Sequence, residues 1–191
     1  MSKQRIKDIA IQHFIRFGYE GTKMAQIAEE TGIRKQSLSY HFASKKALLV
    51  EIYEEVVQEE QQFVREFFAQ SAGQTLEQQL HSFLQEHKNR FLTHPNVAFM
   101  YILSFITPLE VHDFVLAQYR TYLGTLKEEL AGVFAQHPDI RLSPEEATVA
   151  FVTLMDGLDV QLVYETRQSF EQALAIAWNV FWTGIQRSLS S

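Results

Sequence analysis

The first stretch of regular patterning covers residues 3–17, where apolar side chains recur at the spacing of one helical stripe. The residues of this stripe are Ile6, Ala10, Phe14 and Phe17. Gly18 follows where a carboxyl-terminal cap is expected, because glycine adopts the left-handed backbone conformation that ends many helices. The pattern therefore predicts a first amphipathic helix that supports the elements after it.

Residues 24–46 carry a compact pattern of apolar and small residues that predicts two short helices meeting at an angle. Its positions are Ile27, Ala28, Gly32, Ile33 and Leu38. Ala28 allows close approach, and Gly32 supplies the positive φ that stops the first of the two helices. Thr22 is expected to cap that helix. The second helix is predicted at Lys35–His41, so this stretch predicts a helix-turn-helix.

The rest of the chain also has helical periodicity. A long helix is predicted from the cap residue Ser44 to about Ser71, where Ala72 and Gly73 end it. Ser143, followed by Pro144 and two acids, is a strong start signal for another. Further helices are predicted at Leu76–Thr93, Asn96–Ile106, Leu109–Gln136, Pro144–Glu165 and Phe170–Leu189. No alternating strand pattern or internal repeat is found, and the fold class is predicted to be all-α.

Three segments resemble the amino-terminal domain of the TetR family of bacterial regulators: FxxxGYEGT at Phe14–Thr22, IAEETGI at Ile27–Ile33 and SLSYHFASKKALL at Ser37–Leu49. The resemblance implies a three-helix DNA-binding domain at residues 1–48 and a helical ligand-binding and dimerisation domain at residues 49–191. It also implies a ligand-responsive regulator, a repressor that binds a pseudopalindromic operator as a homodimer and is released by a small, largely apolar inducer.

The charge distribution fits a DNA partner better than the total charge does. The whole chain has a net charge of −6, but residues 1–50 contain nine Lys or Arg and only four acids. Residues 1–50 therefore carry +5 and the remainder −11. A basic head on an acidic body is what docking of one end onto phosphate requires.

Other features of composition limit the protein class. A hydrophobic share of 46% over 191 residues permits a real core. There is no cysteine, which excludes disulfides, thiolate zinc sites and cysteine nucleophiles. No run of eighteen apolar residues occurs, the longest candidate being Val97–Ile106, and no charged-then-apolar signal sequence is expected at the amino terminus. A cytoplasmic protein without a membrane partner is expected.

The DNA-contacting residues are expected in the two short helices and at the start of the long one. Gln36 is the best base reader, because its amide pairs with adenine, and Lys35 is placed for phosphate or guanine. Thr22 and Lys23 lie where the second helix should present its amino terminus to phosphate. The full set of candidates is Thr22, Lys23, Arg34, Lys35, Gln36, Ser37, Ser39, Tyr40, His41, Lys45 and Lys46.

Several of these positions depart from the family pattern or leave an alternative open. Ser39 stands where the family usually has a Tyr that touches the DNA backbone, and Tyr40 is expected to supply a neighbouring contact. Lys46 stands where an acid is common. Lys45 and Lys46 are expected to hold phosphate, with two solvated surface lysines as the alternative. His41 is expected either to pack in the core or to contact phosphate.

The second half is rich in aromatics on successive helices, in segments that enclose an inducer pocket according to the family resemblance. The predicted ligand-binding residues are Phe83, His87, Phe91, Phe99, Tyr101, Phe105, Phe114, Tyr119, Tyr122 and Asp156. His87, Tyr119 and Asp156 are the candidate polar anchors among apolar walls. The alternative for each aromatic is ordinary core packing.

The last two predicted helices contain more apolar surface than one helical hairpin should bury. The predicted dimer-interface residues are Val149, Val152, Leu174, Trp178, Phe181, Trp182 and Ile185. This resembles half of the four-helix interface that the family uses. A dimer is also expected because one short recognition helix makes too few contacts to compete against a genome.

An enzyme or a helical adaptor without DNA binding is the alternative function. Helical di-metal sites need Glu-x-x-His pairs, and here Glu77 and His81 are four residues apart. No catalytic triad order, phosphate loop or paired-acid site rises above chance, so no catalytic residue, metal ligand or cofactor is expected. An adaptor would explain the helical body but not the basic head.

Overall fold

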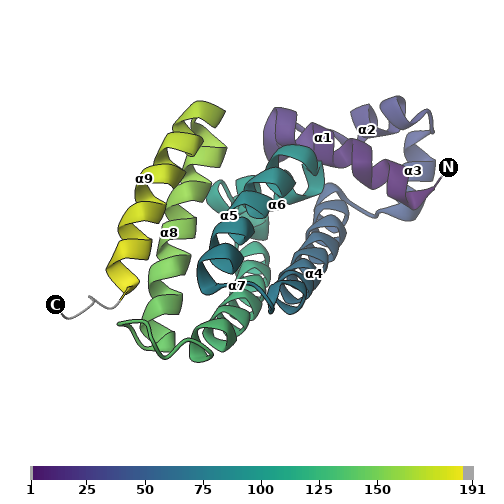
Figure 1. The fold of residues 1–191 in the computed structure, drawn as a ribbon. Coiled ribbons are helices and arrows are strands. Elements are labelled where there is room, and N and C mark those ends of the chain that lie inside the picture. The colour runs from purple at the N-terminus through teal and green to yellow at the C-terminus, as the bar shows by residue number, and fades with distance from the viewer. Residues whose placement is uncertain (1, 187–191) are drawn as a thin grey trace. The chain divides into compact units, whose positions relative to one another are not determined.

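This computed structural model describes residues 2–186, which form a series of helices (Figure 1). The elements are α1 (Lys3–Gly21), α2 (Met24–Thr31), α3 (Lys35–His41), α4 (Lys45–Ser71), α5 (Leu76–Thr93), α6 (Pro95–Phe105), the 3-10 turn η1 (Leu109–Val111), α7 (His112–Ala135), α8 (Pro144–Tyr164) and α9 (Arg167–Ile185). Within residues 2–186, extended pairing is confined to one antiparallel bridge between Ile140 and Gln186. The predicted all-α fold is confirmed.

The predicted helix boundaries rest on capping chemistry that the structure contains. Gly18 has a φ of 68° and Gly32 a φ of 71°, and a side chain at either position would strain the backbone. Ser143 forms a capping box with Glu146, in which each side chain bonds the backbone N–H of the other residue. These hydrogen bonds from Ser143 hold the pKa of the Glu146 carboxyl below its ordinary value.

Three helix starts differ from the approximate positions predicted from the sequence. Thr22 does not cap α2, because its hydroxyl donates to the Gly18 carbonyl at 2.7 Å and Lys23 occupies the cap position. α6 starts at Pro95 rather than Asn96, since proline fits the first turn of a helix. α9 starts at Arg167 rather than Phe170, because the Thr166 side chain accepts a bond from the Ser169 N–H. The predicted end of this helix, Leu189, lies outside the described residues.

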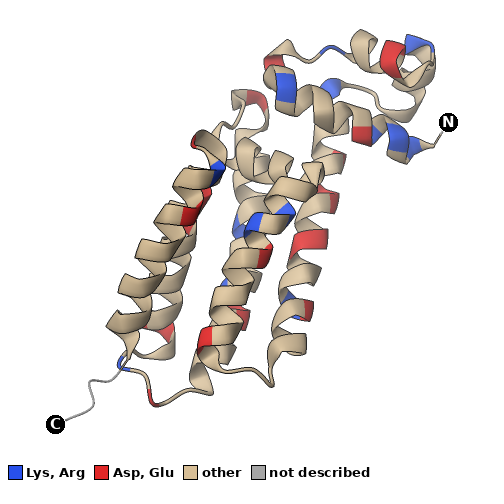
Figure 2. Cartoon of the chain, turned by 45° about the horizontal axis from the view of Figure 1, so that its top comes forward, with Lys and Arg blue, Asp and Glu red and all other residues tan. Residues whose placement is uncertain are grey.

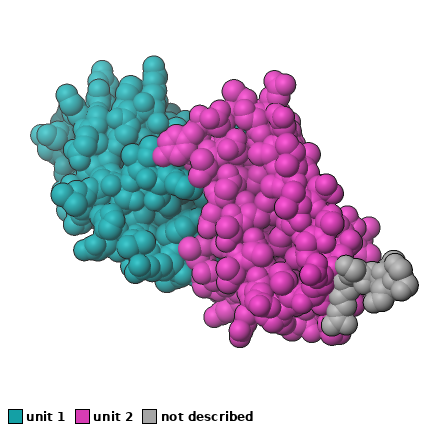
Figure 3. Space-filling view, turned by 90° about the vertical axis from the view of Figure 1, so that its left-hand side faces the viewer, with its two compact units in different colours: residues 1–60, 92–122 teal, residues 61–91, 123–191 magenta. Residues whose placement is uncertain are grey.

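The contacts divide the chain into two compact units (Figure 3). Unit 1 consists of Met1–Glu60 and Leu92–Tyr122, and unit 2 of Gln61–Phe91 and Leu123–Ser191. This division does not follow the predicted boundary after residue 48, because Leu49, Ile52 and Tyr53 of α4 are buried within unit 1. The domain boundary drawn from the sequence stays a prediction.

Each unit has its own aromatic core. In unit 1, Phe99 stacks on Phe14 at a centroid distance of 5.7 Å and meets Tyr53 edge-on at 6.2 Å. In unit 2, Phe83 stacks on Phe68 at 4.9 Å and lies 6.4 Å from Phe151. Aromatic pairs at these separations add to the free energy gained by burial. The two cores hold the exposed residues of each unit in fixed positions.

One helix of the described residues, α8, is long and apolar enough to cross a membrane by length and composition, and 39% of its most apolar window is buried inside the structure. The core helix of a soluble protein has the same property. α8 packs against α9 over most of its length, as Figure 1 shows.

Candidate nucleic-acid interface

The α2–α3 pair is a helix-turn-helix with a small, complete core. Ile27 of α2 and Leu38 of α3 are fully buried, and Phe42 closes the core after α3. Gly32 ends α2, and its N–H bonds the Glu29 carbonyl. Because Leu38 is the one buried residue of α3, the other six side chains of this helix are available to a partner.

The exposed side chains of α3 are almost all polar. They are Lys35, Gln36, Ser37, Ser39, Tyr40 and His41, and Tyr40 is 89% exposed. The core-packing alternative for His41 does not hold, since its ring is exposed and meets Tyr40 edge-on at 5.7 Å. Such a surface offers hydrogen-bond donors and acceptors at no cost to the core.

The predicted residues around α3 fall into two groups. Lys23, Arg34 and Lys46 are exposed, as a phosphate contact requires. Thr22 is buried and bonded to Gly18. The Lys45 ammonium donates to the Tyr19 carbonyl at 2.5 Å and lies 4.1 Å from the Tyr19 ring centroid. Thr22 and Lys45 were predicted to contact DNA, but in the structure their side chains form hydrogen bonds within the chain.

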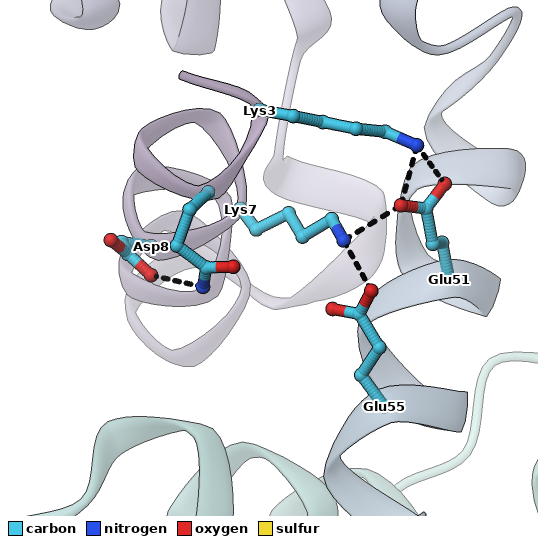
Figure 4. A network of polar contacts seen from close by, with 6 residues as sticks. Lys3, Lys7, Asp8, Glu51 and Glu55 are labelled. Atoms are coloured by element: carbon cyan, nitrogen blue, oxygen red, sulfur yellow. Dashed lines mark hydrogen bonds and ion pairs between the residues drawn. The ribbon is translucent and has the colours of Figure 1, made fainter.

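An ion-pair network fixes α1 against α4 (Figure 4). The buried Lys7 ammonium lies 2.7 Å from Glu51 and 2.5 Å from Glu55, and Lys3 pairs with Glu51 at 2.6 Å. Burial disfavours the charged forms, but the Lys3 and Lys7 hydrogen bonds outweigh it and lower the pKa of Glu51, while Glu51 and Glu55 raise the pKa of Lys7. The network orients the helix that supports the helix-turn-helix.

Two further polar contacts join α1 to its neighbours in unit 1. The His13 ring pairs with Glu30 of α2 through Nε2 at 2.7 Å. The Tyr19 hydroxyl donates to Glu110 of η1 at 2.8 Å, and burial together with this bond raises the pKa of Tyr19. A neutral Tyr19 keeps its proton and remains the donor. α1 is therefore tied to α2, to α4 and to η1.

Six predicted ligand residues lie in unit 1. The Tyr101 hydroxyl donates to Tyr122 at 2.7 Å, and Tyr119 lies 5.7 Å from the Tyr122 ring. Phe114 meets the Tyr53 ring edge-on at 6.1 Å. Phe105, in contrast, is exposed. Tyr101 and Tyr122 are buried and bonded to each other, which supports core packing as the role of these two residues.

The other four predicted ligand residues, Phe83, His87, Phe91 and Asp156, lie in unit 2. His87 pairs through Nε2 with a carboxylate oxygen of Asp159, and both side chains are buried. The second oxygen of Asp159, Oδ2, is buried without a hydrogen-bond partner among the described residues. Asp156 is exposed, and partial desolvation and the Asp159 charge raise its pKa.

Most of the predicted dimer residues are buried by packing within the single chain. Val152, Leu174, Trp178, Phe181 and Ile185 are buried, Trp182 is half-buried, and Val149 is exposed. Packing of α8 on α9 accounts for the burial. The apolar side chains that remain exposed on these helices are Val149, Val160, Tyr164, Ile176 and Val180, and they are called the α8–α9 stripe below.

Sequence reasoning missed two buried charges that carried a signal. Lys7 lies four residues before Ile11 and seven before Phe14, on the buried stripe of α1, and two glutamates one turn apart face it from α4. Asp159 lies four residues after Met155 and seven after Val152, on the buried stripe of α8. A charged residue at a buried helical position predicts a partner across the core.

Fold and exposed surface together define an all-helical protein with an amino-terminal helix-turn-helix. Residues 6–52 match the family model described as bacterial regulatory proteins, tetR family. The regulator RutR of Escherichia coli K12 is 38% identical over 55 residues, which are 29% of this chain and 26% of RutR. This chain thus aligns with about a quarter of the length of that relative.

Two other proteins are similar over most of the chain. IcaR of Staphylococcus aureus (strain Newman), a negative regulator of the biofilm operon icaADBC, is 29% identical over 150 residues and 75% of each chain. The structure of FadR from Bacillus subtilis in complex with stearoyl-CoA superposes with a TM-score of 0.72 at 16% identity, covering 97% of this chain and 100% of FadR. At that identity the likeness concerns the fold.

The amino-terminal part of this chain, residues 6–52, matches the tetR family of bacterial regulatory proteins, as the resemblance in its first fifty residues predicted. RutR and IcaR are named as transcriptional regulators rather than enzymes, in agreement with the prediction that this chain is not an enzyme.

Proposed function

We propose that this regulator is a repressor that binds a pseudopalindromic DNA operator as a homodimer and leaves it when a small apolar inducer binds. The observation that carries the proposal is the surface of α3, which exposes six side chains over the single buried Leu38. A seven-residue helix that contributes one residue to the core has little structural reason for that composition. Base readout in the major groove requires exposed polar side chains on the recognition helix and therefore explains the composition of α3.

The exposed residues suggest a division of labour. Gln36 is the proposed base reader, because its amide can donate to and accept from adenine in one plane. Lys35, Tyr40 and Lys46 are the proposed phosphate contacts, and Lys23 joins them at the start of α2, whose amino terminus has no side-chain cap bond. Thr22 and Lys45 are left out, since the structure gives their side chains internal partners.

Dimerisation is proposed through the α8–α9 stripe. Three of its members, Val149, Ile176 and Val180, are at least 60% exposed, which is unusual for apolar side chains grouped on two packed helices. Charged side chains are sparse on α9, and most of α8 and α9 is tan in Figure 2. A second copy of the same hairpin would bury the stripe in a four-helix arrangement.

Release by the inducer requires a ligand that prefers the conformation unable to bind DNA. α4 contributes Lys45–Glu60 to unit 1 and its remaining turns to unit 2, so a shift of this helix would change the separation of two reading heads in a dimer. Recognition helices must lie about 34–36 Å apart to enter successive major grooves. An apolar drug, a fatty acyl compound or an aromatic metabolite would suit the aromatic side chains of the body. Function on chromosomal DNA implies a cytoplasmic location.

Selection of bound sequences from random double-stranded DNA tests the proposal. The expected result is an enriched site with two inverted half-sites whose centres are about ten base pairs apart, or a multiple of this. The Lys35→Ala, Gln36→Ala double variant is the test protein, and Lys127→Ala, an exposed lysine of α7, is the matched control. No enrichment with the folded wild-type dimer, or equal enrichment with the double variant, would refute it.

A further inference from the structure

Unit 1 contains an open pocket between α1 and α6 that is separate from the α3 surface. Its volume is about 370 Å³, within the range of small-molecule sites. The walls include Phe14 and Phe17 of α1, Phe99 of α6, and Ile106 and Pro108 after α6. Of the predicted ligand residues, Phe99 is one that lines this pocket. The remaining walls are mainly apolar.

Apolar side chains at the mouth of this pocket are incompletely covered. Phe17 is 45% exposed and Ile106 is 59% exposed, and both line the pocket. Neither residue is needed in this position for the core, because Phe14 and Phe99 beneath them are already buried and stacked. An occupant with an apolar body would remove this surface from water.

The electrostatics of the pocket favour a positive occupant. Among the described residues that line it there is no Lys, Arg or His, whereas Glu20 supplies a carboxylate. Two helical segments also end at the pocket: regular α1 geometry breaks at Gly18, and α6 ends at Phe105. The carboxyl-terminal end of a helix carries a partial negative charge, which stabilises a nearby cation.

Contacts next to the pocket show that its aromatic residues accept cations. The Arg16 guanidinium lies 5.0 Å from the Phe17 ring centroid, and the Lys45 ammonium lies 4.1 Å from that of Tyr19. Lys45 is held by the Tyr19 carbonyl, and the Tyr19 hydroxyl by Glu110. Glu20 is exposed, so its carboxylate is accessible to a ligand.

We propose that the α1–α6 pocket binds a small lipophilic cation, with an aromatic or aliphatic body against Phe14, Phe17 and Phe99 and a primary or substituted ammonium group toward Glu20. Binding here touches the turn from Gly18 to Glu20, which leads directly into the α2 start at Lys23. The occupied pocket then alters the setting of α2 relative to α1. Only this last consequence rests on the proposed DNA-binding function.

Isothermal titration of the full-length protein at neutral pH tests the site without any DNA. The probes are phenylbutylamine, phenylbutanol and phenylbutanoate, which share a body and carry a positive, a neutral and a negative head. Phenylbutylamine is expected to bind with a Kd on the order of 0.1 mM. The alcohol should bind roughly threefold to tenfold more weakly, and the carboxylate most weakly, because Glu20 and the helix ends repel it.

Three variants test the location and the charge preference of the site. Ile106→Trp fills the mouth and should abolish binding of the amine, whereas Leu109→Trp, at a residue that is 93% exposed and does not line the pocket, should leave it unchanged. Glu20→Gln should remove the preference for the amine over the alcohol and leave the affinity for the alcohol unchanged. Each variant should melt at the wild-type temperature, because all three side chains are exposed.

Three results would overturn the proposal: no heat of binding for the amine up to several times the expected Kd, equal amine affinity in the two Trp variants, or tightest binding of the carboxylate. Because the titration contains no DNA, the site can fail while DNA binding stands. DNA binding can likewise fail while the site stands. Repeating the DNA titration with saturating amine then measures the effect on α2 separately.

Discussion

The α2–α3 pair and the α8–α9 hairpin expose opposite kinds of surface. In α3 the exposed side chains are polar or basic and a single leucine is buried. In α8 and α9 many apolar residues are buried, and a further apolar stripe, including Val180 at 68% exposure, remains outside. Folding of one chain requires neither the polar and basic side chains exposed on α3 nor the apolar side chains exposed on α8 and α9.

The two surfaces suit different partners. A polar, cationic face is well solvated in water and can bond phosphates and base edges. Because phosphate contacts release counterions, its binding to DNA depends on salt. An exposed apolar stripe gains free energy wherever water is excluded, so its natural partner is another apolar surface. Substitutions that exchange the two chemistries should therefore have unequal effects.

The largest effect is expected from a charge on the apolar stripe. Val180→Glu should convert the proposed dimer to a monomer, raising the dimer dissociation constant by more than about 1,000-fold, because two uncompensated carboxylates would be buried in one symmetric interface. Light scattering coupled to size-exclusion chromatography measures this. Leu109→Glu, at another exposed apolar residue, is the control and should stay dimeric. A dimeric Val180→Glu would remove the stripe from the interface.

The second largest effect, on the free energy of unfolding, is expected from a change at the buried Asp159 of α8. Asp159→Asn should lower the free energy of unfolding by about 3 kcal/mol, since it removes the carboxylate that pairs with the buried His87 ring. Urea unfolding followed by circular dichroism gives the value. Asp156→Asn, the same change at an exposed position of α8, should alter stability by less than about 0.5 kcal/mol. Similar values for the two variants would mean that the pair contributes little.

On the polar surface a single phosphate contact should matter less. Lys35→Ala should weaken binding about tenfold for every DNA sequence and reduce the salt slope of log K by about one per protomer. Fluorescence anisotropy at several salt concentrations measures both quantities. Lys127→Ala is the control on α7. A loss restricted to particular sequences would instead make Lys35 a base reader.

The smallest effect is expected from the network behind the polar surface. Glu51 has a lowered pKa in the folded protein, so its contribution to stability is present above the ordinary carboxyl pKa and is lost as pH falls through the lowered value. Lys7→Met should cost about 1 kcal/mol at neutral pH and make the loss of stability between about pH 5 and about pH 2 shallower.

Urea unfolding across that pH range is the measurement for the network. Lys3→Met, which removes the more exposed partner of Glu51, should have a smaller effect on the same limb. Parallel acid limbs for wild type and Lys7→Met would show that the ion pairs do not contribute to the acid dependence.

Local patterns predicted much of the fold because local rules decide helix boundaries. α3 at Lys35–His41 and α5 at Leu76–Thr93 have the predicted limits, and Gly32 has the predicted positive φ. The cap of α2 differs from the prediction because the Thr22 hydroxyl could bond either an α2 backbone N–H or the Gly18 carbonyl. In the structure it donates to the Gly18 carbonyl. Only the tertiary path of the α1–α2 turn decides between them.

The site was predictable where exposure follows from helical position and not where it depends on packing between distant segments. Lys45 and Lys46 are adjacent and look equivalent in sequence, yet α1 places the Tyr19 carbonyl within reach of Lys45 alone. In α9 the apolar residues exceed one face, so the sequence does not say which ones face α8. Trp178 and Phe181 pack inward, whereas Ile176 and Val180 stay outside.

The most direct measurement of DNA reading by α3 is a double-mutant cycle between Gln36 and one base pair of the selected operator. Affinities of wild type and Gln36→Ala are measured for the operator and for a version with a single A·T pair of each half-site changed. If Gln36 reads a base, a coupling of about 1–3 kcal/mol is expected at one position and close to zero elsewhere. Zero coupling at every position, with both proteins folded and dimeric, would contradict base reading by Gln36.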